Sequence, residues 1–366
     1  MGFNCGIVGL PNVGKSTLFN ALTSTAKAEA ANYPFCTIEP NSGRVAVPDD
    51  RLFKLGELSN SSTIIPSFLE VVDIAGLVKG ASNGEGLGNQ FLGHIRGVDA
   101  VIAMLRCFEG DDVSHVEGCV DPIRDADIVE TELLLADLEI LERRAEHMHR
   151  RIRGGDHREK VLYDLMMQVL EALREGHPAR EVDYDCDESS FFKELALLTA
   201  KPILYVCNVD ESSAAKGNEH SEKVIKRALN EGAEAVVISA AIESEIAQLD
   251  SPRDKTEFLQ TLDLDQTGLS KVAEAGYRLL DLVTFLTTGP KESRSWSVPK
   301  GSTAPQAAGT IHSDFEKGFI CAETISYHDF VTFGGEQAAK DAGKMRQEGR
   351  DYVVEDGDVI LFRFNV

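Results

Sequence analysis

The sequence predicts an α/β protein in which a mostly parallel sheet is covered by helices on both faces. Short apolar runs predict strands at residues 3–8, 68–74, 100–105, 202–207 and 235–238. Helical patterns separate these runs, and parallel strands need such crossovers. Runs that are apolar throughout indicate strands buried on both faces. At 366 residues the chain is longer than one hydrophobic core supports, so we expect two or three domains.

Residues 9–16 follow the first predicted strand and fit the pattern G-x-x-x-x-G-K-[ST] without exception. Glycines let the backbone curl so that its N–H groups point at phosphate oxygens, and the helix that follows adds its positive end. Lys15 is expected to neutralise the β and γ phosphates, and Ser16 to bind Mg²⁺. The motif therefore predicts a phosphate site formed by Asn12, Val13, Gly14, Lys15, Ser16 and Thr17.

A second motif, D-x-x-G, begins at Asp73, at the end of a predicted strand. We expect Asp73 to reach the Mg²⁺ through water and the N–H of Gly76 to sense the γ-phosphate. Thr37 lies between the two motifs and offers the hydroxyl that would complete the Mg²⁺ coordination. The predicted metal ligands are therefore Ser16 and Thr37.

The residues that would bind the base are predicted at the ends of the last two strands. Asn208, Val209 and Glu211 stand where GTPases carry Asn-Lys-x-Asp. Because Glu211 replaces the aspartate that pairs with guanine, and Val209 replaces the lysine, much of the guanine discrimination should be lost. Ser239 and Ala240, after the next strand, are placed to cover the base.

Residues 125–200 interrupt the strand pattern with a different period. Apolar residues recur at alternating spacings of four and three, a heptad pattern, at Leu134, Leu138, Leu141, Ala145, Met148 and Ile152. Gly154 and Gly155 then break the helix. The spacing recurs on a second helix at Leu162, Leu165, Val169 and Ala172. An antiparallel coiled-coil hairpin is predicted; two ordinary amphipathic helices packed on the sheet are the alternative.

The tip of this predicted hairpin has the opposite charge to the chain as a whole. The formal net charge is −23, yet residues 143–160 hold seven basic and three acidic residues. The basic ones are Arg143, Arg144, Arg150, Arg151, Arg153, Arg158 and Lys160. Clustered arginines favour phosphate contacts and nucleic-acid binding. The tip is therefore predicted to contact RNA, with a solvated helix face as the alternative.

Residues 281–366 predict a small α/β module. Residues 283–287 and the surroundings of Trp296 have strand patterns, and residues 304–312 have a helical pattern. Apolar runs on either side of Asp356 and Gly357 predict a terminal β-hairpin. The expected domains are residues 1–124 with 201–280, residues 125–200, and residues 281–366.

The composition fits a soluble cytoplasmic protein. Hydrophobic residues make up 43% and charged residues 27%. No apolar run is long enough to span a bilayer, and residues 1–8 lack the core of a signal peptide. The seven cysteines are scattered without a C-x-x-C spacing and indicate neither a disulfide framework nor a zinc site. Nothing in the sequence demands more than a monomer.

Taken together, the motifs resemble the YchF subfamily of Obg-related P-loop proteins, the Obg-like ATPases. The resemblance depends on residues 9–16, 32–41, 73–81, 208–211 and 314–320, and so covers essentially the whole chain. It implies an Obg-type G domain, a coiled-coil insertion and a C-terminal TGS domain of β-grasp form. It also implies that ATP is preferred to GTP and that the protein associates with the ribosome, chiefly its large subunit, in translation or stress adaptation.

The position after D-x-x-G is Leu77, which cannot orient a water molecule as the glutamine of many GTPases does, so slow hydrolysis is expected. His115 aligns with the histidine proposed as catalytic in this family. His94, or a K⁺ ion held with the help of Asn12, are the other candidates. The predicted catalytic set is Lys15, Asp73, Gly76 and His115.

Three functions remain open at this point. The leading one is a ribosome-associated ATPase that uses Mg²⁺ and acts as a switch. A GTPase of the same architecture is the second. A metabolic kinase is the third, although such enzymes usually need a lid and an acceptor site that the sequence does not show.

Overall fold

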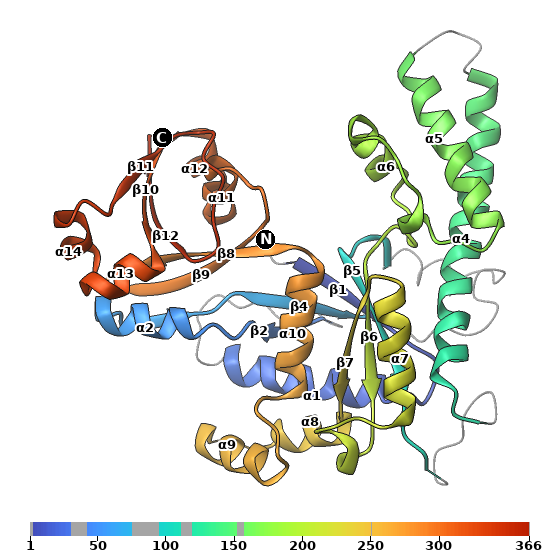
Figure 1. Ribbon diagram of the computed structural model, residues 1–366, viewed down its shortest axis with the longest axis horizontal. Helices are drawn as coiled ribbons and strands as arrows, with labels where there is room; N and C mark the ends of the chain where they lie inside the picture. Colours follow the sequence, from blue (N-terminus) through green and yellow to red (C-terminus); the bar gives the residue numbers. More distant parts are fainter. Residues whose placement is uncertain are drawn as a thin grey trace.

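The computed structural model describes residues 3–30, 42–74, 95–110, 119–151, 157–249 and 251–365. In this part of the chain the strands form two six-stranded sheets. Figure 1 shows the first sheet beside a long helical projection, with the second sheet on the opposite side. No helix among the described residues combines the length and the apolar character that crossing a membrane requires.

The first sheet has the strand order β2-β4-β1-β5-β6-β7. The strands are β1 (Phe3–Val8), β2 (Ser42–Ala46), β4 (Phe68–Asp73), β5 (Ala100–Arg106), β6 (Ile203–Asn208) and β7 (Glu234–Ile238). All neighbours run parallel except β2 and β4, which pair antiparallel. The five predicted strands of this sheet are confirmed, and β2 is an addition that its mixed sequence did not reveal.

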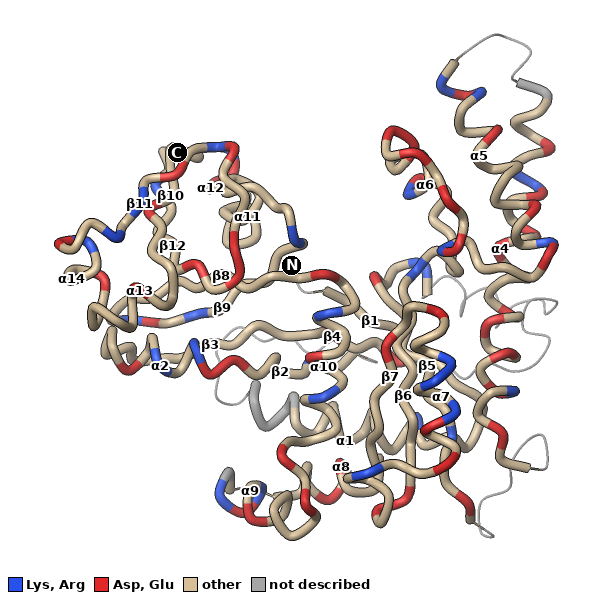
Figure 2. The backbone as a smooth tube through the Cα atoms, in the orientation of Figure 1, with Lys and Arg blue, Asp and Glu red and all other residues tan. Residues whose placement is uncertain are grey.

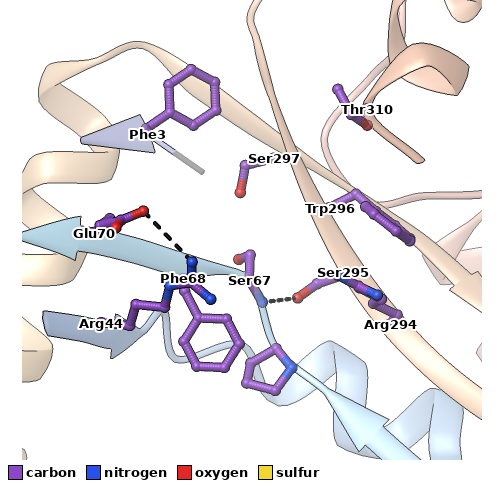
Figure 3. Close-up of a pocket in the computed structure, with 11 residues that line it drawn as sticks. Phe3, Arg44, Ser67, Phe68, Glu70, Arg294, Ser295, Trp296, Ser297 and Thr310 are labelled. Carbon is purple, nitrogen blue, oxygen red and sulfur yellow. Dashed lines mark hydrogen bonds and ion pairs between the residues drawn. The ribbon is translucent and has the colours of Figure 1, made fainter. Parts of the chain in front are cut away.

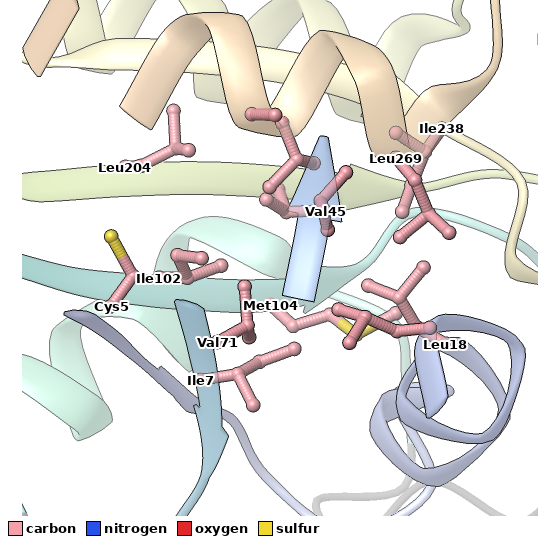
Figure 4. Packing of buried hydrophobic residues seen from close by; sticks show 14 of the residues in the cluster. Cys5, Ile7, Leu18, Val45, Val71, Ile102, Met104, Leu204, Ile238 and Leu269 are labelled. Carbon is pink, nitrogen blue, oxygen red and sulfur yellow. The ribbon is translucent and has the colours of Figure 1, made fainter. Parts of the chain in front are cut away.

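Helices cover both faces of this sheet, as predicted. The alternate residues of β5 show why, because Val101, Ala103 and Leu105 belong to one buried cluster and Ile102 and Met104 to another. The first cluster includes α7 (Glu219–Asn230) and the start of α4 (Pro122–Arg151). The second, shown in Figure 4, includes α1 (Lys15–Ala30) and α10 (Gly268–Leu279). The short helices α8 (Ala240–Ile246) and α9 (Pro252–Thr261) follow β7.

The helical insertion consists mainly of α4 (Pro122–Arg151) and α5 (His157–Arg174), which lie side by side in Figure 1. Most of the predicted heptad residues meet in one buried cluster, namely Leu134, Leu141, Ala145, Leu162, Leu165 and Val169. Leu138 and Met148 pack against it, and Ile152 lies outside the described residues. The short helix α6 (Ser189–Leu195) and the 3-10 turns Ala179–Glu181 and Cys186–Glu188 complete the insertion.

Asp137 fastens α4 to the chain that returns to β6. Its carboxylate accepts hydrogen bonds from the backbone N–H groups of Leu198 (2.9 Å) and Thr199 (2.8 Å) and from the Thr199 hydroxyl (2.7 Å). The side chain is only 1% exposed. Burial raises the pKa of the Asp137 carboxyl, and these hydrogen bonds oppose the rise.

The second sheet has the order β11-β10-β12-β8-β9-β3. Its strands are β3 (Thr63–Ile65), β8 (Leu282–Thr288), β9 (Glu292–Pro299), β10 (Phe319–Ser326), β11 (Arg346–Glu348) and β12 (Asp358–Phe364). The helices of this region are α11 (Ala304–Ile311), α12 (Ser313–Lys317), α13 (Tyr327–Phe333) and α14 (Glu336–Asp341). The predicted strand at residues 283–287 and the predicted helix at residues 304–312 are confirmed.

The predicted terminal hairpin is wrong. β12 lies between β8 and β10 and pairs with both, whereas Val353 on the other side of the Asp-Gly turn bridges to Thr303. The N–H of Ala304 donates to the Tyr352 carbonyl (2.8 Å), and the N–H of Val354 donates to the Ser302 carbonyl (3.0 Å). The predicted turn is present, but the apolar runs on its two sides pair with distant segments and not with each other.

Part of the N-terminal region packs into this second sheet. α2 (Asp50–Ser59) lies against it and β3 is its edge strand, although both come between β2 and β4 in the sequence. Leu52 and Leu55 of α2 share a buried cluster with Leu286, Ile325 and Phe330. No sequence pattern predicted that α2 and β3 pack with the second sheet, because both elements are short.

Candidate nucleotide-binding site

The phosphate loop joins β1 to α1 at the carboxyl edge of the first sheet. Gly14 has a φ of +95°, and a side chain there would place its Cβ 2.3 Å from Asn208 Nδ2. A Cβ at Gly9 would lie 2.7 Å from the Met104 carbonyl oxygen. Both glycines are therefore required by the path of the backbone. α1 begins at Lys15, so the predicted Ser16 and Thr17 occupy its exposed first turn.

Lys15 meets Asp73 across the ends of neighbouring strands. Its Nζ lies 2.5 Å from Asp73 Oδ1 and donates to the Ile74 carbonyl at 3.0 Å. The pairing of β1 with β4, which sets Ile7 opposite Asp73, brings the two motifs together. The two side chains are 11% and 26% exposed, so a phosphate approaching the loop could reach the ammonium.

Asn208 ties two loops together. Its Nδ2 donates to the Val13 carbonyl (2.9 Å), and its Oδ1 accepts the N–H of Ala240 (2.9 Å). The side chain is only 4% exposed. Since these bonds use groups at both ends of the amide, Asn208 holds the phosphate loop against the loop after β7.

A hollow of ≈ 480 Å³ opens where β5, β6 and β7 end. Its lining is Phe108, Asn208, Val209, Asp210, Glu211, Ser212, Ser239 and Ala241. The structure thus brings together the predicted Asn208, Val209, Glu211 and Ser239, with Ala240 directly beside the hollow. An apolar wall with a few polar groups suits a planar base.

The polar groups of this hollow differ in whether other groups of the protein already form hydrogen bonds with them. Ser239 lines the hollow, and its buried hydroxyl has no hydrogen-bond partner within the described residues. Asp210 caps the 3-10 turn Glu211–Ser213 instead, accepting from the Ser213 N–H at 3.0 Å. Its hydrogen bond from the Ser212 hydroxyl lowers the pKa of the Asp210 carboxyl. Glu211 is exposed at the rim.

Phe108 lines the hollow, and the sequence reasoning missed it. The Arg106 guanidinium lies 4.5 Å from the centre of its ring, and Arg106 Nε donates to the Phe108 carbonyl (3.1 Å). Asn218 Nδ2 donates to the neighbouring Cys107 carbonyl (2.6 Å). An aromatic residue just beyond the end of β5, the strand beside β6, was the available signal.

Several predicted residues lie outside the described part of the chain. These are Thr37, Gly76, Leu77, His94 and His115. Asn12 is described and has a φ of +64° in the phosphate loop. The phosphate and base halves of the site therefore have described geometry, whereas the predicted Thr37 ligand and the catalytic histidine do not.

Two family models match the chain. One, YchF-GTPase_C, described as a protein of unknown function (DUF933), covers residues 282–365. The other, described as a 50S ribosome-binding GTPase, covers residues 4–142.

Curated relatives match along the whole length. A protein of Haemophilus influenzae named "Ribosome-binding ATPase YchF" is 54% identical over 366 residues, which is 100% of both chains. "Obg-like ATPase 1" of Pongo abelii is 46% identical and covers 98% of this chain and 92% of its own. The solved structure "Structure of the Schizosaccharomyces pombe YchF GTPase" superposes with a TM-score of 0.88 at 38% identity, covering 99% of this chain and 98% of the other.

Proposed function

This chain belongs to the YchF family of P-loop nucleotide hydrolases, and from that we propose that it is a cytoplasmic, ribosome-associated ATPase that works as a nucleotide-dependent switch. The observation that supports it most is the Lys15–Asp73 pair beside a glycine-constrained loop, fastened by Asn208 to the edge of a hollow suited to a base. We expect three functional regions: an Obg-type G domain (residues 1–124 and 201–280), a coiled-coil insertion (125–200) and a TGS domain (281–366).

The residues present fit an Mg²⁺–nucleotide complex. The first turn of α1 offers its backbone N–H groups to phosphate oxygens, and Lys15 would exchange Asp73 for phosphate. Ser16 and Asp73 are hard oxygen donors of the kind Mg²⁺ prefers, with Thr37 as a further proposed ligand. The ion would neutralise charge that develops on the phosphates. With Lys15 on the phosphate, the Asp73 carboxylate would be free to hold a water molecule of the ion.

The preference for ATP over GTP is proposed from the chemistry of the hollow. In GTPases an aspartate accepts two hydrogen bonds from guanine, whereas here Glu211 is exposed at the rim. Asp210, the other carboxylate of the hollow, caps the 3-10 turn, and Ser239 and Val209 supply none. A GTPase of the same architecture is the alternative.

Calorimetric titration tests this choice directly. ATP and GTP, each with Mg²⁺, would be titrated into the wild type and a Glu211→Asp variant, with Lys15→Ala as the control that should bind neither well. Tighter binding of ATP in the wild type, with a gain for GTP in Glu211→Asp, is expected. Tighter binding of GTP by the wild type would reject the ATPase in favour of the GTPase.

His115 is the proposed catalytic residue for hydrolysis, because Leu77 cannot position water. Single-turnover ATP hydrolysis by His115→Ala should be slower while nucleotide affinity holds. An unchanged rate would remove His115 from the mechanism.

Replacing K⁺ with Na⁺ tests the separate proposal that Asn12 helps to hold a K⁺ ion. A hydrolysis rate that is the same with both ions would exclude that role.

A further inference from the structure

β2 and β4 form an antiparallel pair that runs from the phosphate site to the second sheet, and we call this pair the β2–β4 hairpin although α2 and β3 lie between its strands in the sequence. Ser42 pairs with Val72 at one end, and Ala46 pairs with Phe68 at the other. A strand rises about 3.4 Å per residue, so the six residues of β4 span roughly 20 Å. β4 is also bonded along its other edge to β1, which makes it a stiff element.

One end of this hairpin lies at the phosphate site. Asp73 is the last residue of β4, and its carboxylate and the following Ile74 carbonyl both accept from Lys15 Nζ. When a phosphate takes the Lys15 ammonium, the contacts at the end of β4 must change. The end of β4 is therefore the point at which a bound nucleotide would act on this strand.

The other end enters the second sheet within two residues. Only Pro66 and Ser67 separate β3 from β4. β3 pairs in parallel with β9, with Thr63, Ile64 and Ile65 opposite residues 292–294. The N–H of Ser67 donates to Ser295 Oγ on β9 at 2.7 Å, a contact visible in Figure 3.

α2 adds a second attachment between the hairpin and the C-terminal region. Leu52 and Leu55, which are 1% and 0% exposed, pack into the cluster beneath the second sheet. Arg51 pairs with Asp356 at 2.6 Å, and Asp356 Oδ1 in turn accepts the N–H of Thr284 on β8 (2.9 Å). Close-packed contacts of this kind transmit displacement instead of absorbing it.

We propose that the β2–β4 hairpin is a mechanical link that passes the state of the phosphate site to the C-terminal sheet. A shift of β4 at Asp73 must move β3, because only Pro66 and Ser67 separate the two strands. The second sheet must follow, because β3 and α2 are fastened to β9 and β8. The C-terminal region then takes one position with a triphosphate bound and another with a diphosphate. This link rests on the proposed phosphate site but not on which base the nucleotide carries.

Trp296 provides a direct readout, because it is the one tryptophan of the chain. It lies on β9 and, together with Arg294, Ser295 and Ser297, forms one wall of a cleft of ≈ 270 Å³. The facing wall comes from the hairpin through Arg44, Ser67, Phe68 and Glu70, as Figure 3 shows. Phe3 of β1 also lines this cleft, so a movement of β9 relative to the first sheet changes the surroundings of the indole.

The experiment is a fluorescence titration of the full chain with Mg²⁺ and ADP, or with Mg²⁺ and the β,γ-imido analogues of ATP and GTP. Saturation is established independently by displacement of a fluorescently labelled nucleotide. The wild type should give different Trp296 emission with the triphosphate analogue and with ADP. Arg51→Gln/Ser295→Ala removes the Arg51 ion pairs with Asp49 and Asp356 at one attachment and the hydrogen bond between Ser67 and Ser295 at the other. In this variant that difference should shrink about twofold or more.

A matched control is Arg174→Gln/Ser302→Ala. Arg174 pairs with Glu142 at 2.8 Å on the helical insertion, and the Ser302 hydroxyl bonds the Pro299 carbonyl at 2.6 Å, so both contacts lie outside the hairpin. The control should respond like the wild type. Since coupling between two sites is reciprocal, the ratio of triphosphate to diphosphate affinity should also change in the test variant and hold in the control.

Hydrogen exchange at the amides of Ile64 and Ile65 in the wild type adds a measurement that needs no variant. Their protection should differ between the two nucleotide states. Unchanged Trp296 emission and unchanged exchange at saturating nucleotide would overturn the link, as would a test variant that responds like the wild type. Failure of the labelled nucleotide to bind would overturn the phosphate site itself, and the link with it.

Discussion

Phe108 shows how a single side chain completes the proposed base site. It lies in the wall of the hollow, and the buried Arg106 and the partly buried Asn218 hold its segment in place. Its ring position depends on contacts within residues 106–110, so the aromatic face is fixed before a ligand arrives. Preorganised contacts of this kind lower the entropic cost of binding.

We predict that Phe108→Ala weakens nucleotide binding about tenfold, because loss of a base-stacking aromatic costs about 1–3 kcal/mol. Phe108→Tyr, which keeps the ring, should bind nearly as well as the wild type. Equilibrium titration with the labelled nucleotide measures both. Equal affinity in Phe108→Ala and the wild type would show that the base binds elsewhere.

Asn208 is predicted to contact the nucleotide, and its amide also has partners within the protein. Both ends of the amide bond backbone groups of neighbouring loops. These partners come from loops at Val13 and Ala240, which are far apart in the sequence. Only the assembled sheet brings them within reach.

At the scale of elements, the helical insertion depends on its attachment to the first sheet. Asp137 holds the chain between α6 and β6, and it is the acceptor for two buried backbone N–H groups. The heptad spacing predicted the contacts along α4 and α5. It could not predict this attachment, because a buried aspartate within a helix has no periodic signature.

We expect Asp137→Ala to destabilise the protein by on the order of 3 kcal/mol, since two buried N–H groups lose their acceptor. Glu139→Ala, an exposed position on the same helix, should change stability by less than about 0.5 kcal/mol. Denaturant unfolding followed by circular dichroism makes the comparison. A loss as small as that of the control would mean that water replaces the carboxylate.

The basic end of the helical hairpin is the proposed contact with ribosomal RNA of the large subunit. Figure 2 shows basic and acidic residues mixed along α4 and α5. Arg143 is paired with Glu139, and Arg158 with Glu194, whereas Lys160 is exposed. Part of the basic surplus of this segment is thus neutralised within the insertion itself.

Arg158→Glu/Lys160→Glu should weaken ribosome binding, and the slope of log affinity against log salt should fall by about 1 for each phosphate that the variant no longer binds. Lys317→Glu/Lys340→Glu, which changes the net charge equally on exposed C-terminal helices, is the control. Co-sedimentation with ribosomes across a salt series gives both quantities. Equal weakening by the two variants would point to overall charge and not to the tip.

On the scale of the whole molecule, the two sheets share one segment of chain. α2 and β3 leave the first sheet after β2 and return to it at β4, having packed into the second. The C-terminal region is consequently not an independent appendage. Its stability depends on residues far earlier in the chain, as the hydrogen bond between Ser67 and Ser295, 228 positions apart, illustrates.

Leu55→Ala should therefore destabilise the second sheet, by about 2–5 kcal/mol for a buried leucine. Phe53→Ala, on the same helix but with a side chain 57% exposed, should have little effect. Urea unfolding followed by Trp296 emission reports the second sheet specifically. An unaltered midpoint in Leu55→Ala would contradict the shared core.

The phosphate loop, the buried parallel strands and the amphipathic helices could all be predicted from the sequence, because each depends on residue types at short, fixed spacings. Only the folded chain shows that Asn208 fastens two loops and that Phe108 faces the hollow. It also shows that β12 pairs with β8 and β10 and not across the adjacent turn, and that α2 and β3 belong to the second sheet. These outcomes depend on competition among distant partners for hydrogen bonds and apolar contacts. Local spacing contains no measure of that competition, so the partner that wins is visible only once the elements have packed together.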